Sequence, residues 1–168
     1  MQKLTTDQVK FLLGEYNNMP ARIKNLEERI AQENPDETIY SMSVAQVVSD
    51  MPHGGQISDK TQNLALCHDK ILDTENSQIM QLISTFRQAY IQIGNALESL
   101  SAEEKDLVML SCVERKKWID AFEKINAKHG VMSDSYRRKM VKKSLQKISN
   151  LLYITDREFK LIMTESET

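Results

Sequence analysis

Apolar residues recur at alternating intervals of three and four along the first thirty residues of the chain. The positions are Val9, Leu12, Tyr16, Met19, Ile23, Leu26 and Ile30. This spacing places one apolar stripe along a helix for nearly three heptads. Pro20 lies within the pattern and removes one backbone hydrogen bond, so we expect a kink or a break there. The helical pattern is predicted to end near Asn34 and Pro35.

A second apolar stripe with the same spacing follows in the middle of the chain. Its positions are Ile79, Leu82, Phe86, Ala89, Ile93, Ala96 and Leu100. The helical pattern begins near Lys60, and the polar segment DTENSQ at 73–78 is a weak point that can divide a long helix into two. Two matching stripes can pair as a helical hairpin or with a second copy as a homodimer, and the pattern does not choose between them. Between the stripes, Pro and paired Gly predict a linker over 50–59.

Three shorter helices are predicted in the C-terminal third. Ser101 and Glu104 have the spacing of a capping box, which starts the first of them. The second begins near Lys116 and ends at Gly130, a residue suited to the left-handed position after a helix. Ser133 caps the third. The apolar residues of the three helices are Leu107, Leu110 and Val113, then Trp118, Phe122 and Ile125, and finally Met140, Val141, Leu145, Ile148 and Leu152.

These elements predict an all-α protein with an N-terminal helical or coiled-coil region and a C-terminal helix-turn-helix. The predicted divisions are an N-terminal region that is a candidate for dimerisation (1–49), a linker (50–59), a long helix (60–100), the helix-turn-helix module (101–153) and a tail (154–168). In the tail, Phe159, Ile162 and Met163 are expected to form a short docking helix, and TESET is expected to be disordered.

Composition narrows the class of protein. The chain has 168 residues, of which 40% are hydrophobic and 27% charged, as in globular proteins. It contains no run of eighteen apolar residues and no secretory leader pattern, so we expect a cytoplasmic protein without a membrane partner. Cys67 and Cys112 are far apart in sequence and suit reduced core thiols. Phosphate-binding glycine loops, nucleophile elbows and zinc-ligand spacings are missing, so we expect neither enzyme activity nor a metal or cofactor.

Positive charge is concentrated in one part of the chain. Residues 112–147 contain eleven Lys and Arg but four acids, a local net charge of +7 in a chain whose formal net charge is −2. Clustered cations neutralise nucleic-acid phosphates and release counterions. Three helices with a tight glycine turn before the last match the helix-turn-helix, whose final helix enters the DNA major groove. Double-stranded DNA is therefore the predicted partner.

The predicted contacts divide by position along the last helix. Ser135, Arg138 and Lys139 lie in its first turns and are the candidates for base contacts, with Arg138 able to bind guanine through two hydrogen bonds. The candidates for phosphate contacts are Arg115, Lys116, Lys117, Arg137, Lys142, Lys143 and Lys147. A basic helix face that serves only solvation is the simpler alternative, since basic faces are common and Lys near a helix C-terminus is favoured by the dipole.

The segment LSAEEKDLVMLSCVERKKW, followed by INAKHGVMSDSYRRKMVKKSLQKI, resembles region four of bacterial sigma factors. It is most similar to the form found in phage-encoded late transcription regulators of the RinA and ArpU type, which also have helical N-terminal halves. In that pattern, an apolar residue twelve positions after the turn serine packs the recognition helix, and Ser133 and Leu145 match this spacing. Met140 and Ser144 occupy the intermediate apolar and small positions.

Three residues depart from the family pattern. Asn126 stands where a small alanine lets two helices approach, Met132 is an extra residue in the turn, and Arg137 falls where an apolar residue is typical. These departures leave room for a helix-turn-helix that has lost or exchanged its DNA role.

The resemblance implies a regulator that binds a promoter region and activates late phage genes in the cytoplasm of a bacterial host. Host RNA polymerase is then a further expected partner. The alternative is a phage protein-interaction module of the same fold, which binds host RNA polymerase or inhibits a host nucleic-acid enzyme such as a defence nuclease. Its basic face would then meet an acidic protein surface, and its affinity for free DNA would be low.

Overall fold

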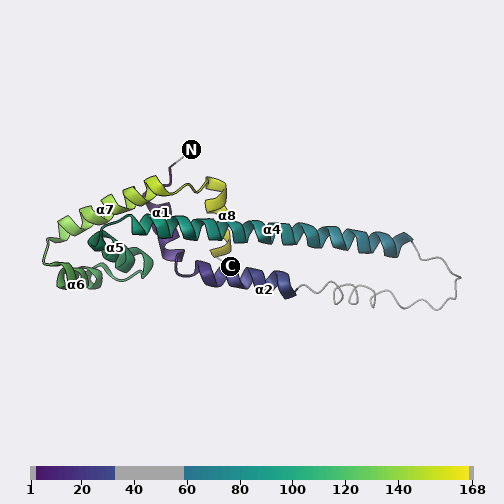
Figure 1. Ribbon diagram of the computed structural model, residues 1–168, viewed down its shortest axis with the longest axis horizontal. Coiled ribbons are helices and arrows are strands. Elements are labelled where there is room, and N and C mark those ends of the chain that lie inside the picture. Colours follow the sequence, from purple (N-terminus) through teal and green to yellow (C-terminus); the bar gives the residue numbers. More distant parts are fainter. Residues whose placement is uncertain (1–2, 33–58, 167–168) are drawn as a thin grey trace. The chain divides into compact units, whose positions relative to one another are not determined.

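The computed structural model describes residues 3–32 and 59–166, with side chains described for 3–30 and 74–166. Every regular element in these ranges is a helix, which confirms the predicted all-α class (Figure 1). The helix end expected near Asn34 and Pro35 lies outside the described residues, as does the linker expected at 50–59 apart from Asp59. Within the described ranges, no helix combines the length and the apolar character that a membrane span requires.

The described helices follow one another along the chain, with residues 33–58 between α2 and α4 outside the description. Their bounds are α1 Thr6–Glu15, α2 Met19–Gln32, α4 Asp59–Glu98, α5 Ala102–Val108, the π-helix η1 Met109–Val113, α6 Trp118–His129, α7 Asp134–Leu151 and α8 Asp156–Ser166. Two compact units result: residues 1–23 and 84–168 form the first, and residues 24–83 form the second. The first unit therefore joins the two ends of the chain.

The first apolar stripe is divided between α1 and α2. Residues 16–18 form a turn, and Pro20 is the second residue of α2. A backbone N–H at this position has no acceptor within the helix, so the proline costs no helical hydrogen bond. The break predicted at Pro20 is thus confirmed. At the start of α1, the Gln8 backbone N–H donates to the Thr5 hydroxyl at 3.3 Å, while the Thr5 N–H donates to the Gln8 side chain at 2.8 Å. This reciprocal capping box fixes where α1 begins.

The long helix α4 runs without interruption for 40 residues. The long helix predicted over 60–100 is therefore continuous, and the weak point at 73–78 does not divide it. That segment contains neither Pro nor Gly, and its polar residues have ordinary helix propensities, so nothing in it terminates a helix. The second stripe is buried as predicted, with Leu82 half-buried; its buried members are Ile79, Phe86, Ala89, Ile93, Ala96 and Leu100.

Within the second unit, the described part of each stripe is covered inside a single chain. Leu26 of α2 and Ile79 and Ile83 of α4 are buried there without a second copy. These positions favour the intramolecular arrangement of the two stripes. Homodimerisation stays a prediction.

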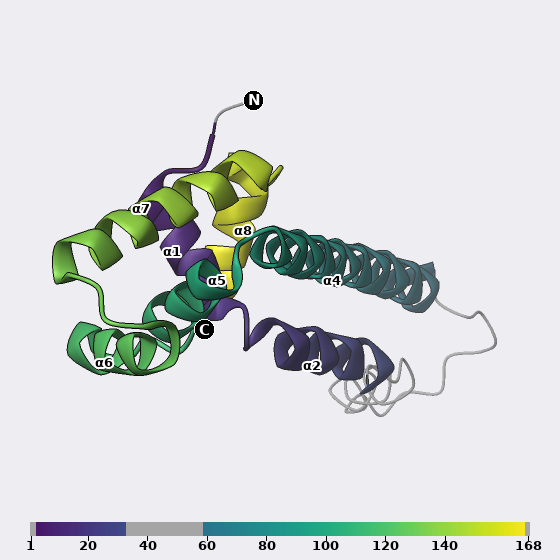
Figure 2. The same cartoon turned by 60° about the vertical axis from the view of Figure 1, so that its left-hand side comes forward.

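The first unit has one shared hydrophobic core. Helix α1 packs against α7 and η1, and α5 packs against α6 and α7; Figure 2 shows α1 beside α7. The most deeply buried apolar residues are Val9, Leu12, Leu13, Met19, Phe86, Ile93, Leu107, Ile125, Leu145, Ile148 and Ile162. The segment 101–153, expected as a separate module, therefore shares its core with α1, with the end of α4 and with α8.

The C-terminal tail forms the docking helix α8. Phe159 is buried, and its ring meets that of Phe11 edge-on with 5.7 Å between centroids. The Arg22 guanidinium donates to the main-chain carbonyls of residues 165 and 166, so a cation satisfies the C-terminal end of α8. The disorder expected for TESET is thus wrong for residues 164–166, which belong to the helix.

A buried carboxylate links three parts of the first unit. Glu15 at the end of α1 is only 7% exposed and accepts hydrogen bonds from Arg115 at 2.9 Å and from Arg22 at 3.4 Å. The Arg115 side chain lies directly over Gly14, where an added Cβ would stand 2.5 Å from its Nη2. Gly14 therefore lets the guanidinium approach the backbone of α1 closely.

We expect Phe86→Ala to lower the free energy of unfolding by about 3–5 kcal/mol, because it removes a fully buried aromatic side chain and leaves a cavity. Ile91→Ala on the same helix is the matched control, since Ile91 is 59% exposed and its loss should cost less than about 0.5 kcal/mol. Urea unfolding followed by circular dichroism measures both. Equal losses for the two variants would contradict the packing of α4 described above.

Candidate nucleic-acid interface

A helix, a short turn and a longer helix make up the part of the molecule that the sequence predicts to bind DNA. Helix α6 ends at His129, and Gly130 follows with φ 94°, a value that glycine adopts without strain. Helix α7 begins after Ser133, whose side-chain oxygen accepts from the Tyr136 backbone N–H at 3.3 Å. The cap predicted at Ser133 is confirmed, whereas Gly130 has a positive φ but, with ψ 157°, not the left-handed helical conformation that was predicted. Together they set the residue at which α7 starts.

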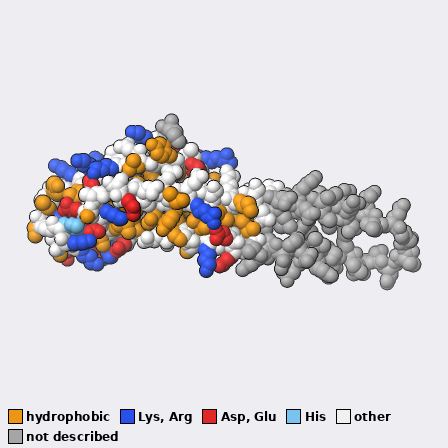
Figure 3. All heavy atoms as spheres, in the orientation of Figure 1, with side chains coloured by type: hydrophobic (Ala, Val, Ile, Leu, Met, Phe, Trp, Pro, Cys, Tyr) orange, Lys and Arg blue, Asp and Glu red, His pale blue; other side chains and the backbone are white. Residues whose placement is uncertain are grey.

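The outer face of α7 presents three lysines. Lys139, Lys142 and Lys143 are three and four residues apart, so they project from one side of the helix. All three are exposed, and none forms an ion pair with another residue of the described ranges. Ser135, one turn earlier, is also exposed. Figure 3 shows Lys and Arg side chains along the edge where Figure 1 places α7.

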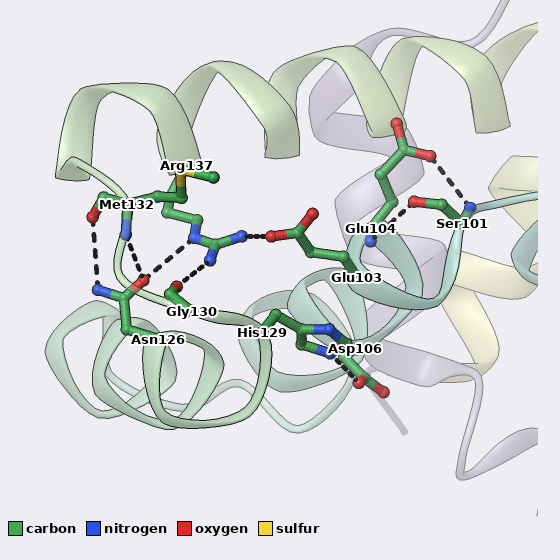
Figure 4. A network of polar contacts seen from close by, with 9 residues as sticks. All are labelled: Ser101, Glu103, Glu104, Asp106, Asn126, His129, Gly130, Met132 and Arg137. Carbon is green, nitrogen blue, oxygen red and sulfur yellow. Dashed lines mark hydrogen bonds and ion pairs between the residues drawn. The ribbon is translucent and has the colours of Figure 1, made fainter.

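Arg137 is not available to a phosphate, which corrects its prediction as a phosphate contact. Its side chain is fully buried, and its guanidinium forms an ion pair with Glu103 of α5. It also donates to the Gly130 carbonyl at 2.9 Å and to Asn126 Oδ1 at 3.3 Å (Figure 4). A charge removed from water is tolerated only when its hydrogen bonds are satisfied, and these acceptors satisfy it. Arg137 therefore positions α7 against α5, α6 and the turn.

The three departures from the sigma-like pattern belong to one hydrogen-bond network. The Met132 backbone N–H donates to Asn126 Oδ1 at 3.3 Å, and Asn126 Nδ2 donates to the Met132 carbonyl at 3.4 Å. The same Asn126 oxygen accepts from Arg137 Nε. An extra residue in the turn leaves backbone groups that need partners, and an asparagine with both donor and acceptor atoms provides them. The three residues thus compensate one another.

Arg138 points toward α6. Its Nε donates to Asp134 at 2.7 Å, and its guanidinium lies 4.8 Å from the centroid of the Trp118 ring. The Trp118 indole N–H also donates to Asp134, and this hydrogen bond, followed by that from Arg138, lowers the pKa of the Asp134 carboxyl. Arg138 remains 60% exposed. It lies on the surface as predicted, but on the α6 side of α7.

Lys147 is tied to the start of α5. Its ammonium donates to both carboxylate oxygens of Glu104, at 2.7 and 2.9 Å. Glu104 also completes the predicted capping box, accepting from the Ser101 N–H at 3.1 Å, which confirms that prediction. The Lys147 hydrogen bond is the main cause that lowers the pKa of the buried Glu104 carboxyl. Lys147 is thus primarily a link between α7 and α5.

The basic run before α6 divides into paired and free cations. Arg115 is held by Glu15 at 2.9 Å, and Lys116 forms an ion pair with Glu114. Lys117 is exposed at the start of α6 and forms no ion pair within the described part of the chain. Of the predicted phosphate contacts, Lys117, Lys142 and Lys143 are therefore the free ones.

A second polar link joins α5 to α6. Asp106 is 2.7 Å from His129 Nε2 and also accepts a hydrogen bond from Lys128. The Lys128 hydrogen bond, followed by that of His129, lowers the pKa of the Asp106 carboxyl. No group of His, Cys, Asp and Glu side chains able to hold a metal ion occurs among the described residues, and Cys67 and His68 lie outside the described side chains.

Sequence reasoning overlooked Lys10 and assigned Trp118 only to the core. Both line one cavity together with Arg115 and Arg138. Nothing in the sequence marks Lys10, because its position in the cavity depends on α1 packing against η1 and α7.

No protein-family model matches this chain, and no curated protein or solved structure matches it. Functional inference therefore rests on the residues and their geometry.

We expect Arg137→Met to lower the free energy of unfolding by about 3–5 kcal/mol, because it leaves the Glu103 carboxylate and two further acceptors without their donor. Adding Glu103→Gln should recover part of this loss, since the unpaired charge is then removed. Lys139→Ala on the same helix is the control and should change stability by less than about 0.5 kcal/mol. Denaturant unfolding of the unmodified protein and the three variants measures these differences. A fully stable Arg137→Met single variant would exclude the positioning role of Arg137.

Folding stability should also fall in acid. Because the folded-state pKa of Glu104 lies below the usual 4.5, its ionised form stabilises the fold at neutral pH, and this contribution disappears as the pH falls from 4.5 through the lowered pKa. Lys147→Ala removes the main cause of the shift, so the acid-dependent loss should shrink. Unfolding free energies measured from pH 7 to pH 3 test this, and an unchanged acid slope in Lys147→Ala would contradict it.

Proposed function

We propose that this protein is a sequence-specific DNA-binding transcriptional regulator that places α7 in the major groove of a duplex. The observation that carries the proposal is the exposed, unpaired face of Lys139, Lys142 and Lys143, on a helix that follows a glycine turn. Lysines held by acids stabilise a fold, whereas lysines without partners on one helix face are suited to neutralising phosphates. The helix-turn-helix order of α6 and α7 supports this use of the face.

The free residues suggest separate roles along α7. Ser135 and Lys139 lie nearest its start, where residues of a recognition helix reach base edges. Lys142 and Lys143 lie further along, and with Lys117 at the start of α6 they are placed for phosphate contacts. Arg138, held between Asp134 and Trp118, is less free to contact a base than its sequence position suggested.

The resemblance to sigma region four and to the RinA and ArpU regulators supports a narrower form of the proposal. In that form the protein activates late phage genes at a promoter, in the cytoplasm of the bacterial host and in contact with host RNA polymerase. A homodimer would then bind half-sites related by a two-fold axis.

A second candidate function is that of a protein-interaction module. The turn before α7 exposes Val131 and Met132, at 87% and 45%, and the first turn of α7 exposes Tyr136 at 48%. Exposed apolar groups beside a basic face suit a protein partner such as host RNA polymerase or a nucleic-acid enzyme. This candidate predicts weak binding to free DNA.

Titration of the protein against labelled random duplex DNA at several salt concentrations tests the proposal. We expect micromolar binding whose logarithm falls linearly with the logarithm of salt concentration. Lys143→Ala should weaken binding to all duplexes alike and reduce the salt slope by about one, because one phosphate contact is lost.

Lys160→Ala is the matched control, because Lys160 is an exposed lysine of α8 in the same unit. It should bind duplex DNA like the unmodified protein. Absence of duplex binding even at low salt would overturn the DNA proposal and favour the protein-interaction module.

A further inference from the structure

A cavity of about 450 Å³ opens beside α7, and its walls come from α1, η1, the segment after η1, α6 and α7 of the first unit. Three cationic residues line it: Lys10 from α1, Arg115 from the segment after η1, and Arg138 from α7. Trp118 contributes an aromatic wall. No acidic residue is among the residues that line the cavity, so the lining side chains carry three positive charges. A volume of this size is in the range of small-ligand sites.

All three cations are more than half exposed: the side chains of Lys10, Arg115 and Arg138 are 52%, 61% and 60% exposed. Each forms one ion pair, Lys10 with Asp7 at 3.5 Å, Arg115 with the buried Glu15 at 2.9 Å and Arg138 with Asp134 at 2.7 Å. In the pairs of Lys10 and Arg138 both partners are exposed, so these pairs are weak and an anion that accepts two hydrogen bonds can compete with them. Arg115 has further N–H groups that can donate to an anion while it holds Glu15.

The backbone holds Arg115 in this place. Its φ of 50° is the one positive value of a non-glycine residue in the described ranges. A non-glycine residue in this region is unfavourable and persists only where its surroundings impose it. Here Gly14 admits the guanidinium against α1, since a Cβ there would stand 2.5 Å from Arg115 Nη2. Sequence and backbone together thus place a cation at the cavity.

The cavity also contains a thiol close to Lys10. Burial raises the pKa of Cys112, and the positive charge of Lys10 partly opposes this rise.

We infer that this cavity binds a phosphate group, and that in the DNA complex this group is a backbone phosphodiester next to α7. The inference rests on the proposed DNA-binding function and extends the interface to α1, over a hundred residues away in sequence. A guanidinium group binds two phosphate oxygens through paired hydrogen bonds, and Lys10 of α1 supplies a further positive charge at the cavity. A phosphate of a free small molecule would present the same chemistry, and the experiment separates the two sources.

Trp118 is the chain's single tryptophan and lines the cavity, so its fluorescence reports on occupation. The full-length protein is titrated with random duplex DNA and, separately, with inorganic phosphate at constant ionic strength. We expect duplex DNA to shift the Trp118 emission. Lys10→Gln should raise the dissociation constant for duplex about 3- to 10-fold at 0.1 M salt and reduce the salt slope by about one. The exposed Lys160→Gln, with the same charge change on α8, should alter neither.

The possible results separate this inference from the proposed function. If Lys10→Gln binds duplex as tightly as the unmodified protein while Lys143→Ala binds more weakly, DNA binding stands and the cavity inference is overturned. If duplex does not bind but inorganic phosphate shifts the emission in a Lys10-dependent way, the backbone phosphate is excluded and the DNA function fails. If neither titrant acts, both proposals fail. Because Lys10 is half exposed, circular dichroism of Lys10→Gln should match that of the unmodified protein.

Discussion

The buried guanidinium of Arg137 is the constraint on which the C-terminal helices depend. A cation removed from water requires hydrogen-bond acceptors around it, and Glu103, Gly130 and Asn126 supply them from α5, the turn and α6. Satisfying one side chain therefore sets the positions of α5, α6 and the turn relative to α7. The extra turn residue Met132 is accommodated by the same asparagine. Positions that depart from the sigma-like pattern thus form an internally consistent alternative to it.

This arrangement divides the basic residues into two groups with different physical roles. Arg137, Lys147 and Arg115 have carboxylate partners on other elements and act between helices. Lys139, Lys142 and Lys143 have no such partners and remain on the surface of α7. Part of the net positive charge of residues 112–147 is therefore neutralised by ion pairs within the fold and is not available to a ligand. Only the second group supports recognition of DNA along α7.

Both ends of the chain pack into one compact unit, so α1 contributes residues beside the C-terminal helices of the candidate interface. Helix α1 covers α7 and η1, and Arg22 holds the end of α8 through its main-chain carbonyls. Glu15 sits between Arg22 and Arg115, so the same buried carboxylate joins the N-terminal segment to the docking helix and to the edge of the cavity. Glu15 thus contacts both a residue that holds the tail and a residue that lines the cavity.

Local patterns in the sequence determined the helices, the break at Pro20, the capping box of Ser101 and Glu104 and the cap at Ser133, because these depend on residues close together in the chain. The weak point at 73–78 does not divide α4, because polar residues do not by themselves end a helix. The tertiary structure alone decided which cations are free. Arg137 and Lys142 look alike in sequence, but burial and ion pairing depend on contacts with α5 and α6 that no local pattern records. The placement of Lys10 beside Arg138 likewise arises from packing between residues far apart in the chain, and so only the folded molecule determines it.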